Sequence, residues 1–147
     1  MKKQILATVA TLSIVITLTI TGLAGLGTKV TANIPFDFTV NGKTLPAGAY
    51  EVAPGTTKNT LVIRNWENRV AISTLTMEAS DKSKGKARLI FRRYGNQHFL
   101  VQVYDGTSGE GQELIKSKAE REAAKTDHLA LKGAAPEIIT ISAQAGQ

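Results

Sequence analysis

Apolar and polar residues alternate along the chain from residue 30 onward. Over residues 30–40 every second side chain is apolar, and most of the residues between are polar. Because successive side chains of a strand point to opposite faces, this pattern predicts a strand with one buried face. Pro35 lies in the polar-facing set and has no amide to donate, which predicts an edge position or a bulge. Asn41-Gly42 follows and is typical of a hairpin turn.

Further short strands follow, separated by turns rich in Gly, Asn and Pro. They are expected near residues 50–52, 60–64, 69–77, 87–94, 98–104 and 137–142, with an exposed polar loop over 78–86. Strands spaced by roughly 8–12 residues predict an all-β fold, mainly an antiparallel sandwich or a small, partly open barrel. The expected core residues are Ile34, Phe36, Phe38, Val40, Leu61, Ile63, Val70, Ile72, Leu89, Phe91, Phe99, Val101 and Val103.

The C-terminal third adds one short helix to this domain. Ser117-Lys118-Ala119-Glu120 matches a capping box, in which the Ser117 hydroxyl accepts from the amide three residues on while Glu120 reaches back. Helix-forming residues follow, so we expect the helix over about residues 117–126. Residues 33–142 then form a single β-rich domain, and residues 143–147 are expected to be a frayed tail.

The first 32 residues have the order of an export signal. Lys2 and Lys3 precede an apolar run over residues 5–20, and small residues follow it. This order predicts a secretory signal peptide that is cleaved somewhere within residues 24–32, and Val30-Thr31-Ala32 is the most familiar form of a cleavage site. The protein is then secreted or periplasmic, with no stable transmembrane span after cleavage. The alternative is an uncleaved helical anchor, because the apolar run is just long enough to span a bilayer core of about 30 Å.

Removal of the signal lowers the positive charge of the chain. The 147 residues include 18 Lys and Arg and 12 Asp and Glu, for a formal charge of +6. Cleavage after Ala32 removes Lys2, Lys3 and Lys29, which leaves 15 basic residues against 12 acidic ones. A net charge of +3 is too mild to favour nucleic-acid binding. The absence of cysteine excludes disulfides, cysteine zinc sites and a thiol nucleophile.

Two stretches of the chain resemble one known family. The stretches IPFDFTVNGKTLPAGAYEV (residues 34–52) and FRRYGNQHFLVQVYDGTSGEGQELIKSKAERE (residues 91–122) resemble a family of small, uncharacterised secreted proteins of soil-type bacteria. The shared pattern comprises a Pro-Phe-x-Phe strand, a Leu-Pro-Ala-Gly-x-Tyr turn, an Arg-Tyr-Gly hairpin and a Glu-Leu-x-Lys-Ser helix start. Ile115 departs from it, since the family commonly has Pro before the helix. The resemblance implies an exported β-rich domain and no particular reaction.

The residues that could carry catalysis lack a recognisable arrangement. No Gly-x-Ser-x-Gly elbow accompanies His98 or His128, so a catalytic triad is not indicated. Asp37 and Glu51 fall at outward positions of neighbouring strands, where an exposed carboxylate is a poor general acid at neutral pH. Trp66 is the one indole that could offer a platform to a sugar. We therefore assign no catalytic residue.

The residue types of the loop over residues 105–110 are those of a possible metal site. It gathers the hard oxygen atoms that calcium prefers, but it lacks the ligand spacing of a calcium loop. Gly, Asp and Ser are also the residues that ordinary turns favour. We expect neither a metal nor a cofactor.

Basic residues gather over residues 82–93. Along the expected strand, Arg88, Arg92 and Tyr94 share one face and Arg93 points the other way. Such a cluster could bind an anionic polymer through counterion release, although charges on an edge strand also prevent edge-to-edge pairing. The candidate ligand-binding residues, here called the basic cluster, are Lys82, Lys84, Lys86, Arg88, Arg92 and Tyr94.

These observations predict an exported, non-enzymatic β module of the envelope or extracellular space. Its expected partner is an envelope protein or a polysaccharide rather than a nucleic acid. One alternative is a cell-wall-directed hydrolase that uses Asp37, Glu51, Asp105 and Glu110. The other is a binder of anionic polymer through the basic cluster.

Overall fold

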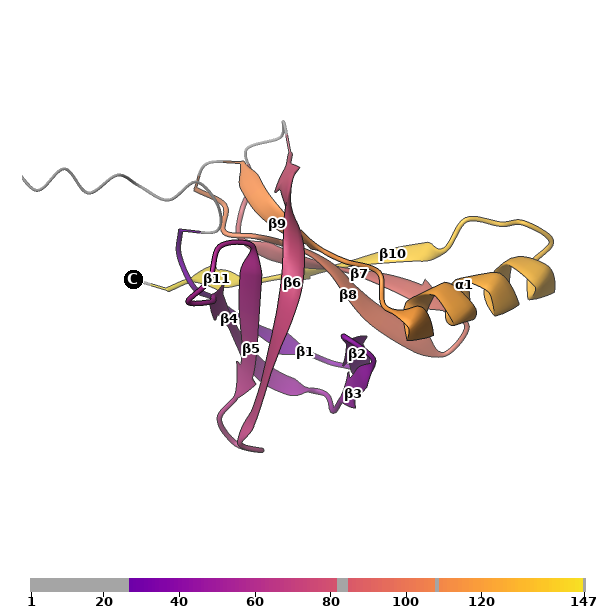
Figure 1. Ribbon diagram of the computed structural model, residues 1–147, viewed down its shortest axis with the longest axis horizontal. Coiled ribbons are helices and arrows are strands. Elements are labelled where there is room, and N and C mark those ends of the chain that lie inside the picture. Colours follow the sequence, from indigo (N-terminus) through magenta and orange to yellow (C-terminus); the bar gives the residue numbers. More distant parts are fainter. Residues whose placement is uncertain (1–26, 82–84, 108, 147) are drawn as a thin grey trace, which may run out of the picture.

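The computed structural model describes residues 27–81, 85–107 and 109–146 (Figure 1). Over these residues the chain forms one mixed sheet of eleven strands and a single helix near the C-terminus. The predicted β fold with one C-terminal helix is confirmed, and the sheet is not closed. The elements are β1 (Val30–Ile34), β2 (Phe38–Val40), β3 (Lys43–Leu45), β4 (Gly48–Pro54), β5 (Thr60–Asn65), β6 (Val70–Ser80), β7 (Arg88–Tyr94), β8 (Gln97–Tyr104), β9 (Glu110–Leu114), α1 (Lys118–Ala130), β10 (Glu137–Ser142) and β11 (Gln144–Ala145).

The long strand β6 joins the two halves of the sheet. Its first part, residues 70–75, pairs with β5, and its second part, residues 76–80, pairs with β9. The order β5-β4-β1-β11 continues on one side of β6 and the order β9-β8-β7-β10 on the other. In Figure 1 β4 and β5 run steeply, whereas β7, β8 and β10 run across the view. The core lies where the two halves face each other.

The two edge strands of this sheet are consecutive along the chain. β10 pairs with β7, β11 pairs with β1, and Ala143 alone separates β10 from β11. The Ala143 amide donates to the Ala87 carbonyl (2.9 Å), and the Gly146 amide donates to the Lys29 carbonyl (2.7 Å). The C-terminal segment therefore ties both halves together on the side away from β6. A frayed tail was expected here, but residues 144 and 145 form a strand.

The first predicted strand is divided at Pro35. β1 ends at Ile34 and β2 begins at Phe38, because proline removes a backbone donor from the ladder. Phe36 lies in the break and packs edge-on against Phe91, with ring centroids 5.1 Å apart. The break lets one run of sequence contribute to both halves of the sheet.

The predicted turn at Asn41-Gly42 joins β2 to β3. Asn41 has φ 49° and Gly42 has φ 78°, and both central residues of a type I′ hairpin turn need positive φ. Asn and Gly adopt this conformation at the lowest cost. β2 also pairs in parallel with β8 at Thr39 and Phe99, which sets the β2–β3 hairpin beside β8.

Most of the predicted core residues are buried between the two halves. Phe38 lies at the centre, with its ring edge-on to both Tyr50 and Phe91 at centroid distances of 4.9 and 5.5 Å. Offset and edge-on aromatic pairs of this kind are favourable beyond the area they bury. The predicted residues found buried in this core are Ile34, Phe38, Val40, Leu61, Ile63, Ile72, Leu89, Phe91 and Val103, while Phe36 and Val70 pack against it partly buried.

A bulge in β8 creates a second, smaller core. Phe91 pairs with Leu100 but Ile90 pairs with Gln102, so Val101 is an additional residue in β8. Leu100 belongs to the main core, whereas Phe99 and Val101 form the second core beneath α1. Phe99 and Val101 are buried as predicted, but they lie in the second core and not with Val103, because strict alternation takes no account of the bulge.

Deletion of residues 144–147 tests the role of β11. The deletion removes the pairing with β1 and the hydrogen bond from Gly146 to Lys29. Since each backbone hydrogen bond contributes about 0.5–1.5 kcal/mol net, we expect the free energy of unfolding in urea to fall by about 1–4 kcal/mol. Deletion of Gln147 alone is the control and keeps these bonds. Equal urea midpoints for the two truncations would show that β11 does not stabilise the fold.

Candidate functional site

The basic cluster is divided between two places along β7. Lys82 and Lys84 lie outside the described residues. Lys86 is exposed, and its carbonyl accepts from the Arg88 guanidinium (3.2 Å). Arg88 forms an ion pair with Asp81, and its guanidinium carbon lies 4.3 Å from the centroid of the Tyr104 ring. An acid and an aromatic ring thus hold this arginine against the protein.

Arg92 and Tyr94 lie at the other end of β7, under the helix. Arg92 Nη1 lies 3.2 Å from Glu120 Oε1, and the Tyr94 hydroxyl donates to the same oxygen at 3.4 Å. Tyr94 and Glu120 are buried, and burial raises the pKa of the Tyr94 phenol. On the opposite face, Arg93 pairs with Glu137 of β10 (2.6 Å). Each arginine of β7 therefore has an acidic partner within the chain.

The predicted capping box is half formed. The Glu120 amide donates to Ser117 Oγ (3.2 Å), which confirms the N-terminal cap of α1. The Glu120 carboxylate does not complete the box, because it turns toward Arg92 and Tyr94 of β7. The helix is also longer than predicted, since it continues to Ala130.

Two carboxylates on one face of α1 fix the helix to the β7–β8 hairpin. Glu120 and Asp127 lie two turns apart and are the buried residues of the helix. Asp127 Oδ1 accepts from the Gly95 amide in the β7–β8 turn (3.1 Å). Ala123 and Ala124, between them, pack against the second core. Polar contacts at both ends and small apolar contacts in the middle therefore set the position of α1.

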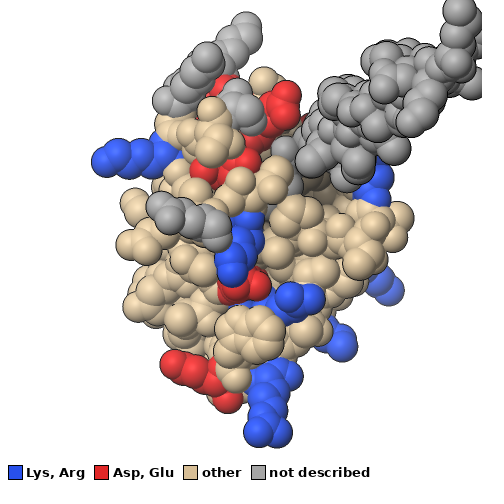
Figure 2. Space-filling model, turned by 90° about the vertical axis from the view of Figure 1, so that its left-hand side faces the viewer, with Lys and Arg blue, Asp and Glu red and all other residues tan. Residues whose placement is uncertain are grey.

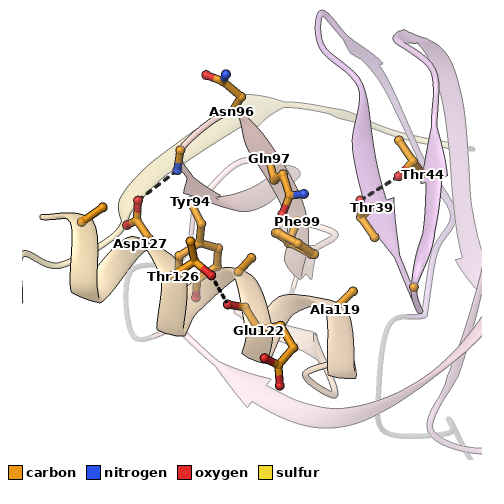
Figure 3. Close-up of a pocket in the computed structure, with 14 residues that line it drawn as sticks. Thr39, Thr44, Tyr94, Asn96, Gln97, Phe99, Ala119, Glu122, Thr126 and Asp127 are labelled. Carbon is orange, nitrogen blue, oxygen red and sulfur yellow. Dashed lines mark hydrogen bonds between the residues drawn. The ribbon is translucent and has the colours of Figure 1, made fainter.

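A cleft of about 580 Å³ lies between α1, the β7–β8 turn and the β2–β3 hairpin (Figure 3). We call it the helix cleft. Its polar groups largely bond to one another: the Thr126 hydroxyl donates to the Glu122 carbonyl (3.1 Å), and the hydroxyls of Thr39 and Thr44 are 3.2 Å apart. The lining residues include Thr39, Thr44, Tyr94, Gln97, Phe99, Glu122, Thr126 and Asp127.

The carboxylates considered for hydrolysis have structural partners. Asp37 Oδ1 accepts from the Ala47 amide (2.9 Å) and so ties the bend before β4 to the break after β1. Asp105 is buried and accepts from both the amide and the hydroxyl of Thr107, at 2.9 and 2.8 Å. This pattern is an Asx turn, in which the side chain shapes the backbone. Glu51 has two basic partners, Lys29 and Arg64.

Residues of β1, β4, β10 and β11 line a hollow of about 500 Å³ together with Trp66 in the turn between β5 and β6. The indole is 69% exposed and stands in the turn between β5 and β6. We call this depression the Trp66 hollow. Figure 2 shows the molecule from the side of β11, β4 and β5, and there basic and acidic side chains are interspersed with uncharged surface. The hollow is lined by Thr31, Ala32, Asn33, Ala49, Tyr50, Glu51, Trp66, Ser142 and Gln144.

The turn that carries Trp66 is held by the residue before it. Asn65 is buried, and its Oδ1 accepts from the amides of Glu67 (2.9 Å) and Asn68 (3.1 Å). Arg64 lies beside the indole, with its guanidinium carbon 5.8 Å from the ring centroid. These contacts present the ring to solvent in a set position.

The sequence alone shows Trp66 only as an isolated indole. The signal that points to the hollow is the set of polar residues on the outward side of the alternation in β1, which includes Thr31 and Asn33. Their strand partners could not be read from the sequence. The pairing of β1 with both β4 and β11 brings these residues together with Trp66.

Comparisons of the chain with protein-family models, with curated proteins and with solved structures found no match. Over the part of the chain that the structure describes, no three His, Cys, Asp or Glu side chains come together as a possible metal site. None of the helices within those same residues is long and apolar enough to cross a membrane.

Replacement of Glu120 tests how α1 is held. Glu120→Ala leaves Arg92 and Tyr94 without their shared acceptor, so we expect the free energy of unfolding in urea to fall by about 2–4 kcal/mol. Glu122→Ala changes an exposed carboxylate of the same helix and should stay within about 0.5 kcal/mol of the unmodified protein. If both variants unfold at the same urea concentration, the buried carboxylate does not hold the helix.

The stability of the fold should fall in mildly acidic solution because of His98. Its ring stacks on Phe36 at a centroid distance of 4.0 Å, and burial, with Arg93 second, lowers the pKa of His98 below its ordinary 6.5. Between the lowered pKa and 6.5 the unfolded chain binds more protons than the folded chain, so stability rises with pH across this interval.

The measurement is the melting temperature from about pH 7.5 to about pH 5.5. We expect it to decrease toward acid, and His98→Phe, which keeps a ring on Phe36, should remove part of the decrease. His128→Phe changes an exposed histidine of α1 and is the control. An unchanged slope in His98→Phe would contradict the prediction.

Proposed function

We propose that the protein is an exported, non-enzymatic β module of the bacterial envelope or extracellular space, and that it binds a surface component there. The observation that carries the proposal is the contrast between two sets of polar side chains. Arg88, Arg92 and Asp105 are engaged in contacts within the chain. A polar surface that is open to a partner lies in the Trp66 hollow, where hydroxyl and amide groups adjoin an exposed indole.

The order of the N-terminal residues supports export. A short basic start, an apolar run and small residues precede the β domain. In this proposal the leader is cleaved and the β domain is released into the periplasm or the medium. An uncleaved leader that anchors the domain is the alternative arrangement.

The first strand favours a cleavage site near the start of the predicted window. Val30 is fully buried and pairs with Val52 of β4 and Ala145 of β11. Cleavage after Ala32 would remove the first part of β1 together with these contacts. We therefore propose that cleavage occurs before Lys29, after Ala24 or Gly27, where small residues also have suitable spacing.

The alternative of an anionic polymer as ligand is weakened by the ion pairs of the basic cluster. Arg88 and Arg92 already have acidic partners, and Tyr94 is buried. A polyanion would have to compete with these carboxylates and with the cover that α1 provides over Arg92 and Tyr94.

Export and binding are tested together on cells that express the full chain. We expect the protein in the periplasm or the medium, with an N-terminal residue between 25 and 28 by N-terminal sequencing, and we expect it to sediment with purified envelope fragments. Retention in the cytosol with Met1 intact, or no binding to any envelope fraction, would overturn the proposal.

An activity screen on cell-wall substrates supplies the enzymatic control. The purified protein should give no turnover, and Asp37→Asn and Glu51→Gln should change nothing. Turnover that either variant abolishes, at an unchanged melting temperature, would favour the hydrolase instead.

A further inference from the structure

We infer that the Trp66 hollow binds a neutral polysaccharide, with the indole stacked on one face of a sugar ring. The inference rests on the proposed binding function and names its ligand class. Its basis is the combination of an exposed aromatic ring, a floor of small side chains and a surrounding set of hydroxyl and amide groups.

Three neighbouring strands place the polar groups of the hollow in rows. Thr31 of β1 lies opposite Glu51 of β4 on one side and Gln144 of β11 on the other. Asn33 lies opposite Ala49, two residues along the same face. Adjacent strands are about 4.8 Å apart, which is the scale of one sugar ring, so hydroxyls of successive positions on a sugar can meet successive strands.

Glu51 is the one charged side chain among the described residues that line the hollow, and it is paired with two basic side chains beside it. Glu51 Oε2 lies 3.3 Å from Lys29 Nζ, and Glu51 Oε1 lies 3.9 Å from Arg64 Nη1. An anionic ligand would be repelled by the carboxylate, and a cationic ligand would be repelled by the two basic groups. A sugar hydroxyl both donates and accepts, so it can bond to the carboxylate, to an amide or to a hydroxyl without bringing a charge. A lining that is uncharged apart from one paired carboxylate therefore favours a neutral, hydroxyl-rich ligand.

The indole supplies the apolar part of the contact. A sugar ring has an apolar face of C–H groups, and covering an exposed indole with it removes apolar surface from water. Ala49 has a small side chain beside the ring and leaves room for this approach. The neighbouring Arg64 restrains the indole before binding, which lowers the entropy cost of fixing it.

The ligand is expected to be longer than one sugar unit. Trp66 also lines a second hollow, of about 390 Å³, together with Arg64 and Arg69. One aromatic ring thus adjoins two depressions, and a chain of sugars can cross it from one to the other. This arrangement favours a chain of sugars over a single sugar.

The only tryptophan of the chain provides a direct readout, because its emission reports on this site alone. The protein recovered from cells that express the full chain is titrated with two neutral probes, cellohexaose and the hexamer of N-acetylglucosamine. We expect a saturable change in tryptophan emission with at least one of them, and a weaker response to glucose. No change with either hexamer would overturn the inference.

Variants assign the binding to the hollow. Retention on insoluble cellulose or chitin should fall at least tenfold in Trp66→Ala and should also fall in Asn33→Ala. Leu75→Ala is the matched control, since Leu75 is an exposed apolar residue of β6 outside the hollow. Its retention should equal that of the unmodified protein, and all three variants should keep the same melting temperature.

The outcomes separate this inference from the proposed function. Envelope binding that Trp66→Ala leaves intact would overturn the glycan site and keep the binding module. Binding to polygalacturonate in place of the neutral probes would overturn the neutral ligand class. Absence of any envelope binding would overturn both.

Discussion

Backbone pairing of the C-terminal segment with two separate strands is the constraint on which the structure depends. β10 completes the ladder of β7 and β11 completes that of β1, while β6 links the same two halves elsewhere. The halves are thereby held face to face, and the aromatic residues of the main core fill the space between them. Without β10 or β11, β7 or β1 would lose its partner at the edge of the sheet, and that side of the core would be exposed to water.

The same pairing decides which polar residues become neighbours on the outside. Inward positions of the strands are committed to the core, so the surface properties of the domain come from the outward positions and from the turns. At one end these groups pair with α1 through Glu120 and Asp127. At the other end they surround Trp66 without an element that covers them. The polar groups beside α1 therefore stabilise the fold, whereas those beside β1 and Trp66 remain exposed to solvent.

The alternation of residues is sufficient to predict most of the strands, the Asn41-Gly42 hairpin and most of the core, but it misses β9 and places residues 78–80 of β6 in a loop. It fails where a single residue changes the register. Val101 is an extra residue in β8, and the choice of which strand contains a bulge depends on the partner across the ladder. The partners of Glu120 and the strand at residues 144–145 are equally non-local. The candidate site could not be predicted either, because Thr31 and Trp66 are far apart in the sequence and only the strand pairing brings them together.

The pairing of the first described strand with the last sets an order of events for folding. β1 needs residues 144 and 145 of β11 as a partner, so the ladder cannot be completed until residue 145 has been synthesised. Contacts between the ends of a chain are slow to form, because they close the longest loop. If the protein is exported as proposed, this delay keeps the chain unfolded while it passes through the translocation channel. The topology that joins the two ends would then also keep the protein competent for transport.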